Sequence, residues 1–299
     1  MRDKKWFFIV NPTAGRGRTG KKINELVTSL NQHKFDFEIE LTKSPGHGTK
    51  LTKDAILNGS HNIIAVGGDG TLNEIVNGVM LSGKADEVCI GCVPEGGGND
   101  FSTNFHLSSN INKAVNTLQK YKKQKVDIGK IEDKYFINSL GIGFDARVAI
   151  ISNRIKHLNG LPRYLAAVLK ALISLKMFKA EIKIDTGIIN EPFLLLSVGN
   201  GQSAGGGFLL TPEARVDDGL LDICFISTVN RRRVLKLLPS AIKGKHLKEP
   251  EVVIHQTRKI EISSDKALPL YFDGELPTLK DQFNFTIEIL PNRIDFIVN

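Results

Sequence analysis

The sequence predicts an α/β domain, with helices on both faces of a parallel sheet, followed by a β-rich domain of sandwich or barrel-like type. Short apolar strands alternate with helical patterns up to about residue 126, and short β-type runs dominate after it. The length of 299 residues also exceeds that of one ordinary domain. We place the domains at residues 1–130 and 131–299, and allow the last strand to return to the first domain.

The first domain is expected to alternate strands and helices. Runs of β-branched and aromatic residues predict the strands, and apolar residues spaced three or four apart predict the helices. The predicted strands are Trp6–Val10, Phe35–Leu41, Ile63–Val66 and Val88–Val93, and the predicted helices are Gly20–Leu30, Thr49–Leu57 and Thr71–Met80. In such a parallel sheet, the glycine-bearing loops after Val10, Val66 and Val93 should gather at the carboxyl edge, where ligands bind.

The second domain is expected to be mostly antiparallel, because its β-type runs are short and separated by turn residues. The predicted strands are Lys134–Asn138, Glu181–Asp185, Phe193–Gly199, Leu220–Ile226, Val252–His255, Lys259–Ser263, Leu268–Phe272 and Phe283–Ile289. Two helices, Tyr164–Phe178 and Arg231–Ile242, are expected to interrupt them. No apolar run reaches about 18 residues, so we expect no membrane-spanning helix. Only five apolar residues, Trp6–Val10, follow the charged start, so we expect no signal peptide.

The chain is moderately basic, with 40 Lys and Arg against 32 Asp and Glu, which gives a net charge of +8. This balance favours an anionic partner such as a nucleotide, an acidic membrane surface or a nucleic acid. Nucleic acid is the least favoured, because aromatic residues make up only 7% and show no pattern suited to stacking bases. Three cysteines exclude a disulfide framework, and Cys89 and Cys92 are expected to be buried structural thiols.

The most informative motif is Gly-Gly-Asp-Gly-Thr-Leu-Asn-Glu at residues 67–74. It follows a predicted strand and opens a predicted helix. Glycines let a ligand approach the backbone, and a helix start offers unpaired N–H groups and a positive dipole end, so this loop suits phosphate. Asp69 would repel phosphate unless a cation such as Mg²⁺ bridges the two. The alternative is a glycine-rich turn in which Asp69 only caps the helix.

The other two glycine loops give weaker signals. After the first strand, Gly15, Gly17 and Gly20 satisfy the dinucleotide pattern G-x-G-x-x-G and nearly satisfy the P-loop, except that Lys22 stands where Ser or Thr should hold Mg²⁺. In the third loop, three glycines at 96–98 let the next residues, Asn and Asp100, approach a ligand closely. A plain glycine-rich turn and a mobile loop with a helix cap are the respective alternatives.

Together these loops resemble the catalytic domain of the diacylglycerol kinase family. The motifs that carry the resemblance are Asn-Pro-Thr-Ala-Gly-Arg-Gly at 11–17, the 67–74 motif, and Gly-Gly-Gly-Asn-Asp-Phe at 96–101. More narrowly, the chain resembles the two-domain soluble bacterial lipid kinases, because matching motifs follow at 199–208, 212–222 and 272–275. The family usually has Gly-Thr-Gly-Asn-Asp in the third loop. Gly97 replaces that Thr here, which removes a hydroxyl expected to touch ATP phosphate.

The resemblance implies an ATP site and two Mg²⁺ sites. The ATP-binding residues would be Asn11, Pro12, Thr13, Ala14, Gly15, Thr42, Gly67, Gly68, Asp69, Gly70, Thr71, Leu72, Asn73, Gly97 and Asn99. The metal ligands would be Asp69, Asp100 and Asp127 near the phosphates and, at a structural site, Asp218 with the backbone carbonyls of Arg215 and Leu220. An ordinary Asp-Gly hairpin turn explains the spacing at the second site equally well.

Two carboxylates, Asp273 and Glu275, flank Gly274 after the predicted strand Leu268–Phe272. Residues two apart can face the same side, so one carboxylate can take a proton while the other positions it or binds metal. A simple Asp-Gly turn explains the same residues without catalysis. The resemblance favours a catalytic base, for which we prefer Glu275, with Asp273 as its partner or rival.

A basic stretch at Asn230–Lys248 has leucines and valine between its charges. Its basic residues are Arg231, Arg232, Arg233, Lys236, Lys243, Lys245 and Lys248. A basic amphipathic helix can lie on an anionic bilayer. A solvated helix face is the usual explanation for such a run, but a lipid kinase must meet its substrate at a membrane.

The sequence therefore predicts an ATP- and Mg²⁺-dependent lipid kinase that phosphorylates a hydroxyl of a membrane lipid, with diacylglycerol to phosphatidic acid as the first choice. Phosphatidylglycerol, a sphingoid base, ceramide and a monoacylglycerol stay open as acceptors. The expected location is the cytoplasm, with peripheral contact at the inner face of an anionic membrane. No nucleic-acid partner is expected, and a homodimer is allowed.

Three other function classes stay open. An NAD kinase-like enzyme is similar at Gly67–Glu74, although the first loop and the 272–275 motif favour lipid kinases. A non-catalytic nucleotide or lipid sensor is compatible with Gly97. A dinucleotide oxidoreductase rests only on Gly15, Gly17 and Gly20.

Overall fold

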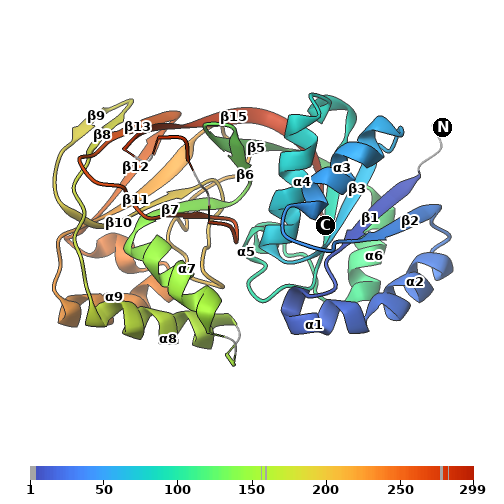
Figure 1. Cartoon of the computed structure of the whole chain (residues 1–299), viewed down its shortest axis with the longest axis horizontal. Coiled ribbons are helices and arrows are strands. Elements are labelled where there is room, and N and C mark those ends of the chain that lie inside the picture. Colours follow the sequence, from blue (N-terminus) through green and yellow to red (C-terminus); the bar gives the residue numbers. More distant parts are fainter. Residues whose placement is uncertain (1–4, 156, 159, 277–278, 282) are drawn as a thin grey trace. The chain divides into compact units, whose positions relative to one another are not determined.

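A computed structural model describes residues 5–155, 157–158, 160–276, 279–281 and 283–299. The chain divides into two compact units, one made of Met1–Val126 with Asn292–Asn299, and the other of Asp127–Pro291. The C-terminal residues thus return to the first unit. Each unit has its own apolar core, and one long C-terminal strand contributes to the sheets of both (Figure 1).

The first unit is a parallel sheet with helices on both faces (Figure 1). Its strands lie in the order β2 (Phe37–Leu41), β1 (Trp6–Val10), β3 (Asn62–Gly67), β4 (Cys89–Pro94) and the end of β15 (Asn284–Ile297), and each neighbouring pair is parallel. The helices are α1 (Ala14–Lys21), α2 (Ile23–Gln32), α3 (His47–Leu57), α4 (Asp69–Leu81), α5 (Asp100–Thr103) and α6 (Ile111–Lys120), with a short 3-10 turn at Ala85–Glu87.

Burial on both faces explains the sequences of the central strands. Strands β1, β3 and β4 are buried at every position, so they are continuous apolar runs and do not alternate with polar residues. Helices α2 and α6 cover the face that includes Trp6 and Phe8. Helices α3 and α4 pack closely together, and a Cβ on Gly78 of α4 would lie only 2.5 Å from the Cβ of Thr52 of α3. The sheet is thereby enclosed except at its edges.

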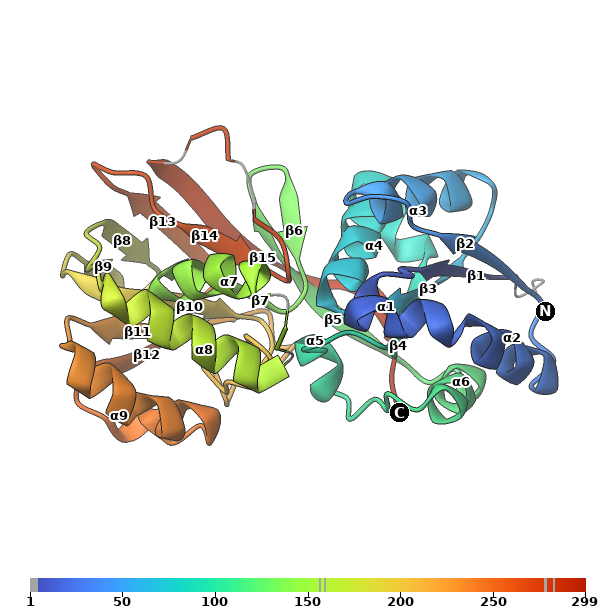
Figure 2. The same ribbon diagram turned by 60° about the horizontal axis from the view of Figure 1, so that its bottom comes forward.

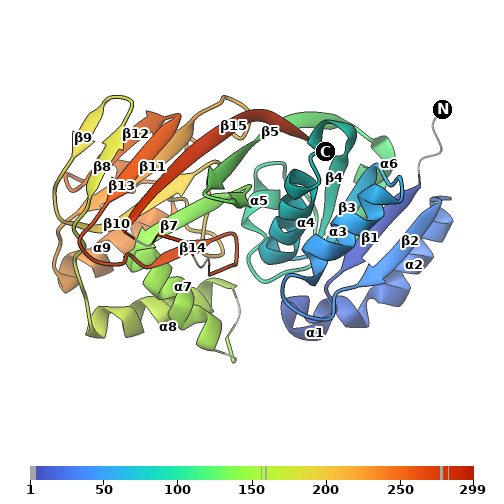
Figure 3. The same cartoon turned by 45° about the horizontal axis from the view of Figure 1, so that its top comes forward.

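The second unit contains two sheets that share one core. The antiparallel sheet has the order β12 (Val252–Thr257), β11 (Leu221–Ser227), β10 (Phe193–Gly199), β7 (Ser139–Gly143) and β14 (Leu270–Phe272). The other sheet includes β15, β13 (Lys259–Ser263), β8 (Glu181–Ile184) and β9 (Gly187–Ile189), with β5 (Lys123–Ile131) and β6 (Lys134–Phe136) beside them. Figure 3 shows β15 and β13 running alongside each other in this layer.

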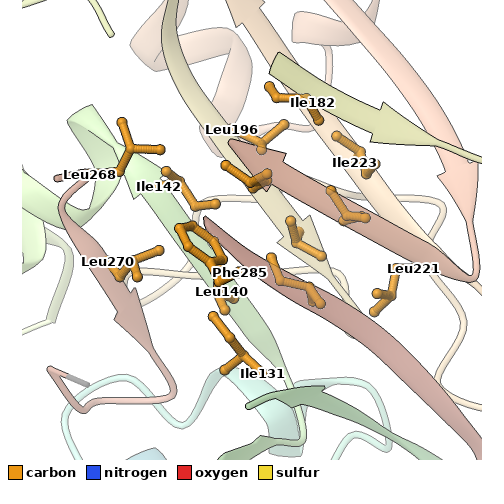
Figure 4. Packing of buried hydrophobic residues seen from close by; sticks show 14 of the residues in the cluster. Ile131, Leu140, Ile142, Ile182, Leu196, Leu221, Ile223, Leu268, Leu270 and Phe285 are labelled. Atoms are coloured by element: carbon orange, nitrogen blue, oxygen red, sulfur yellow. The ribbon is translucent and has the colours of Figure 1, made fainter. Parts of the chain in front are cut away.

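Alternate residues of the strands fill the space between the two sheets (Figure 4). Leu140 and Ile142 of β7 and Leu221 and Ile223 of β11 point into it from one sheet, and Phe285 of β15 points into it from the other. This period of two is the pattern of sheets that pack face to face. The core of the unit therefore depends on the alternation that marked these runs as strands.

Helices cover the other face of the antiparallel sheet. These are α7 (Phe144–Arg154), α8 (Gly160–Ile173) and α9 (Arg231–Ile242), with a 3-10 turn at His246–Lys248, and their apolar residues form a second cluster against β10 and β11. Figure 2 shows α8 and α9 lying next to each other on this side. No helix in the part of the chain that the structure describes is long and apolar enough to cross a bilayer.

The predicted fold class is confirmed, and the differences concern individual elements. The predicted helix Gly20–Leu30 is part of two helices, α1 and α2, and the predicted strand Phe283–Ile289 continues to Ile297. Helices α5, α6 and α7 and strands β5, β7 and β9 had not been predicted. Strand β7 is rich in glycine because α7 packs closely on it: a Cβ on Gly141 would lie 2.4 Å from the Oδ2 of Asp145. This packing requirement removes the usual β-type residues from the sequence.

Candidate functional site

The first glycine loop, which follows β1, is tied to the loop after β3. The side-chain Nδ2 of Asn11 donates to Thr71 Oγ1 at 3.2 Å, and its Oδ1 accepts from both the amide and the hydroxyl of Thr13. The backbone then turns through left-handed conformations at Gly15, Arg16 and Gly17, with φ of 56°, 62° and 78°. The segment assigned to α1 therefore begins with an irregular turn, as a loop that exposes backbone N–H groups requires.

The second and third glycine loops touch each other. Strand β3 ends at Gly67, whose carbonyl accepts the amide of Glu95 at 2.8 Å, and α4 begins at Asp69. A Cβ on Gly96 would lie only 2.3 Å from the Cα of Gly68. Only glycine permits this approach, so the two loops form one surface at the carboxyl edge of the sheet.

Asp69 links these two loops through its carboxylate. Its Oδ2 accepts the amide of Asn99 at 2.7 Å, and its Oδ1 accepts the amide of Phe101 at 3.2 Å. Burial raises the pKa of Asp69, and the amides of Phe101, Asp100 and Asn99 oppose this effect. The alternative in which Asp69 caps a helix is thus realised, but the capped helix is α5 and not α4.

The third loop is closed by Asn99 and leaves Gly97 open. Asn99 has a φ of 60°, and its Oδ1 accepts the amide of Gly96 at 2.8 Å. A Cβ on Gly97 would have no neighbour within 4 Å. The Thr that the family usually has at this position would therefore fit without moving the loop.

Glu95 is a site residue that had not been predicted. Its side chain is buried, with 1% exposed, and it forms ion pairs with Lys22 Nζ at 2.7 Å and Arg18 Nε at 3.4 Å. Arg18 also donates to the carbonyl of Gly96 at 2.9 Å, and a Cβ on Gly15 would meet the carbonyl of Glu95 at 2.6 Å. The Lys22 that breaks the P-loop pattern thus anchors the first loop to the third. An acidic residue directly before three glycines was the available sequence signal.

Glu74, the last residue of the second motif, holds the start of α3. Its two carboxylate oxygens accept the amides of Gly46 at 2.7 Å and Gly48 at 2.6 Å. Thr42 lies just before this segment, and its amide donates to the carbonyl of Val10 at 2.9 Å. Thr42 is therefore placed beside the first loop, as expected for a residue of the same site.

The structure brings together the predicted residues of the first unit but orients two of them inward. Those at the carboxyl edge are Asn11, Pro12, Thr13, Ala14, Gly15, Thr42, Gly67, Gly68, Asp69, Gly70, Thr71, Gly97 and Asn99. Leu72 and Asn73 are buried within α4, where Asn73 accepts from the amide side chain of Asn77. Leu72 and Asn73 therefore support the helix.

Asp127 belongs to the second unit, and Asp69 and Asp100 belong to the first. Its carboxylate accepts the amide of Gly219 at 2.6 Å, and its own amide donates to the carbonyl of Val216 at 2.7 Å. Within the described ranges, no group of three or more His, Cys, Asp or Glu is arranged to hold a metal ion. Asp127 thus anchors the Asp-Gly turn, and its place in a metal site with Asp69 and Asp100 stays a prediction.

The Asp-Gly turn itself has a second feature of interest. Asp218 accepts the amide of Leu220 at 3.0 Å, and Gly219 has a φ of 72°. The Oδ2 of nearby Asp222 is buried without a hydrogen-bond partner. Burial raises the pKa of Asp222 to about 6, and the charges of Asp218 and Glu213 add to this rise.

The two carboxylates of the 272–275 motif have different environments. Asp273 has a φ of 44° and is buried, and its carboxylate accepts the amides of Ile137 at 2.6 Å, Asn138 at 3.1 Å and Ser139 at 2.9 Å. These three bonds stabilise the ionised carboxylate. The side chain of Glu275 is half-buried. Asp273 therefore fixes the turn that carries Glu275.

An apolar cavity of about 50 Å³ lies between the antiparallel sheet and helices α7, α8 and α9. Its lining includes Phe144, Val168, Leu195, Phe208, Val234 and Leu237. A polar contact also lies here, a hydrogen bond from the hydroxyl of Tyr164 to Asp145. Burial raises the pKa of Asp145, and the bond from Tyr164 opposes part of this rise. Neither residue had been singled out from the sequence.

Comparisons with known proteins agree with this architecture. The family model "Diacylglycerol kinase catalytic domain" matches residues 5–131, and "YegS C-terminal NAD kinase beta sandwich-like domain" matches residues 138–298. A diacylglycerol kinase of Staphylococcus carnosus (strain TM300) is 31% identical over 268 residues, which cover 89% of this chain and 87% of that relative. A YegS-like lipid kinase of Chromohalobacter salexigens is 31% identical over 94% of this chain and 89% of its own length.

A solved structure shows the same fold. A crystal structure described as that of a diacylglycerol kinase from Bacillus anthracis str. Sterne superposes with a TM-score of 0.81 and 25% identity, and the match covers 100% of this chain and 96% of that one. The nucleotide-type loops of the first unit and the β-rich second unit thus define a two-domain kinase. The chain belongs to the diacylglycerol kinase family of bacterial lipid kinases, and it is a lipid kinase.

The contacts of Asp273 predict a structural effect of its replacement. Asp273→Asn would set an NH₂ group against backbone donors, which should cost about 1–3 kcal/mol and lower the melting temperature by roughly 3–10 °C. Asp265→Asn, on an exposed residue, is the matched control and should melt like the wild type. An unchanged melting temperature for Asp273→Asn would show that this carboxylate is not an anchor of the turn.

Proposed function

We propose that this lipid kinase transfers the γ-phosphoryl group of ATP, with Mg²⁺, to the free hydroxyl of diacylglycerol, and that it does so in peripheral contact with the inner face of the cytoplasmic membrane. The observation that carries the proposal is the joined set of three glycine loops at the carboxyl edge of the first unit's sheet. The names of the relatives from S. carnosus and B. anthracis support diacylglycerol as the acceptor.

The glycine loops suit the ATP phosphates for electrostatic reasons. Backbone N–H groups of the first loop and of the start of α4 lie at the same edge, where the dipole of α4 adds positive potential. Arg18 and Lys22 bring two positive charges to the first loop, and the carboxylate of Glu95 brings one negative charge. We assign the phosphates to this surface, with Asn11, Thr13 and Thr71 at its polar rim.

The residues at both proposed Mg²⁺ sites fit a hard cation. Asp69 offers carboxylate oxygens whose pKa is raised by burial, and a cation would relieve that cost. At the Asp-Gly turn, the unpartnered Oδ2 of Asp222 and the nearby Asp218 mark a place where negative charge lacks compensation. When bound, Mg²⁺ neutralises phosphate charge at the first site. At the second site it would join Asp218 with the carbonyls of Arg215 and Leu220.

The second unit supplies the acceptor side in this proposal. Glu275 takes the proton of the lipid hydroxyl as the phosphoryl group arrives, and Asp273 holds the turn through the amides of Ile137, Asn138 and Ser139.

NAD is the second candidate acceptor, because the family description of residues 138–298 refers to an NAD kinase sandwich. The test is transfer of labelled phosphate from ATP to a panel in mixed micelles that contains diacylglycerol, monoacylglycerol, ceramide, a sphingoid base and phosphatidylglycerol, with NAD in parallel. We expect diacylglycerol to be labelled fastest. Labelling of NAD alone would replace the proposal with an NAD kinase, and ATP binding without any labelling would indicate a sensor.

The assignment of the base predicts a selective kinetic effect. Glu275→Gln should lower kcat by roughly 10²–10⁴-fold with diacylglycerol, because general-base catalysis is of that size, while the Kd for ATP stays within a few-fold. Asp273→Asn should cost less at a temperature where it is folded. If Glu275→Gln turns over within a few-fold of the wild type, the base lies elsewhere.

The metal assignment predicts a response to chelation and to a change at Asp69. EDTA should abolish activity and added Mg²⁺ should restore it. Asp69→Asn should lower kcat on the order of 100-fold and raise the Mg²⁺ concentration needed for half-maximal rate. Asp54→Asn, on the exposed surface of α3, is the matched control. Near-wild-type turnover of Asp69→Asn would leave Asp69 as a loop anchor only.

A further inference from the structure

The positive charge of this chain is concentrated in two segments. Residues 146–180 contain seven Lys and Arg and no Asp or Glu, and residues 223–248 contain another seven, again with no acidic residue. These segments hold fourteen of the 40 basic residues, so the remainder of the chain has 26 basic residues against 32 acidic ones. The net charge of +8 therefore comes entirely from these two segments.

Both segments contribute to the helical layer on the antiparallel sheet, where α8 and α9 lie side by side (Figures 1 and 2). Arg231 at the start of α9 donates to the carbonyl of Ile173 at 3.0 Å, which joins it to the end of α8. Arg147 of α7 donates to the carbonyl of Ser174 at 2.7 Å and to its hydroxyl at 2.8 Å. Three helices thus meet around the end of α8.

Helix α8 is apolar on two sides. Its inner side, including Val168 and Leu172, is buried in the core of the helical layer. On its outer side, Leu169 is 56% exposed and Ile173 is 75% exposed, and on α9 Leu235 is 45% exposed. A soluble surface helix normally places polar residues on its outer side, so these exposed apolar groups indicate a partner.

Exposed cations surround these apolar side chains. Lys170 follows Leu169 on α8, and Arg232 and Lys236 lie three residues before and one residue after Leu235 on α9. Neither segment contains an acidic residue that could pair with these cations locally.

Arg233 differs from the other basic residues of α9. The expectation that the whole basic run can contact a membrane is therefore corrected at this residue. It forms ion pairs with Glu249 and Glu251, and these raise the pKa of Arg233. The pairs hold the side chain against the segment that precedes β12, so it does not contribute to the outer charge.

We propose that the surface formed by Leu169, Lys170, Ile173, Arg232, Leu235 and Lys236, named here the α8–α9 surface, docks on an anionic phospholipid bilayer. The apolar side chains enter the acyl boundary and the cations meet lipid phosphates. A second copy of this chain is a poorer partner, because a two-fold contact would bring like charges together. The inference rests on the proposed function, since docking brings a lipid kinase to its acceptor.

The test is flotation with vesicles of equal parts phosphatidylcholine and phosphatidylglycerol, compared with phosphatidylcholine alone. Wild type should bind the anionic vesicles, and added salt should weaken binding. Lys170→Gln, Arg232→Gln and Lys236→Gln combined should weaken it on the order of 100-fold, at about fivefold for each charge. Leu169→Asp with Ile173→Asp should weaken it by at least about tenfold.

Matched controls carry the same changes in the first unit. Lys50→Gln, Lys53→Gln and Lys113→Gln combined remove three exposed charges, and Leu57→Asp changes a leucine that is 73% exposed. These controls should bind vesicles like the wild type. Equal binding by the wild type and both surface variants overturns the proposal. So does a dimer in sedimentation equilibrium that Leu169→Asp with Ile173→Asp abolishes, because a second copy then covers the surface.

Activity on short-chain diacylglycerol in detergent micelles separates this inference from the proposed function. The wild type and both surface variants should phosphorylate it at equal rates, because the substrate arrives without a bilayer. The variants should lose activity only on vesicles. If the wild type binds anionic vesicles and the surface variants do not, docking holds even when no lipid is phosphorylated. That result would overturn the proposed acceptor lipid and leave the docking proposal standing.

Discussion

The ion pairs and the backbone amide of one buried residue, Glu95, join the three glycine loops of the first unit. Glu95 is removed from water at the end of β4, and a buried charge costs several kcal/mol unless it is paired. Lys22 and Arg18 supply the partners, so the first glycine loop must lie against the third. The backbone amide of Glu95 in turn donates to the carbonyl of Gly67 in the second loop. The glycine at 15 follows from this arrangement, because a side chain there would collide with the carbonyl of Glu95.

Other buried or half-buried acids in the chain act in a related way, with backbone amides in place of cations. Asp69 holds the start of α5, Glu74 holds the start of α3, and Asp127 holds the turn at Gly219. Asp273 does the same for three successive amides. A carboxylate that accepts backbone amides fixes the backbone around it. This division of roles leaves Glu275 as the carboxylate to which we assign proton transfer.

The basic residues of the helical layer, unlike the buried acids, mostly lack partners of opposite charge nearby in the sequence. Acidic residues are absent from the two segments that form most of the helical layer, so basic residues there lack local partners, with Arg233 as the exception. The same helices are apolar inward, where they line a cavity, and partly apolar outward at Leu169 and Ile173. One helical layer therefore combines an apolar inner side that packs on the sheet with a basic outer surface suited to lipid headgroups.

The sequence by itself determined the fold class and most strands and helices of both units, because apolar spacing reflects which faces are buried. It also identified the three glycine loops, since glycine is required wherever backbones approach closely. It did not indicate the anchoring role of Glu95, the buried Asp145–Tyr164 pair or strand β7, where Gly141 makes room for Asp145. Nor could it separate Asp273 from Glu275, because both fit the same turn. Those distinctions depend on contacts between residues far apart in the chain, and only the tertiary structure decides which carboxylate meets an amide, a cation or solvent.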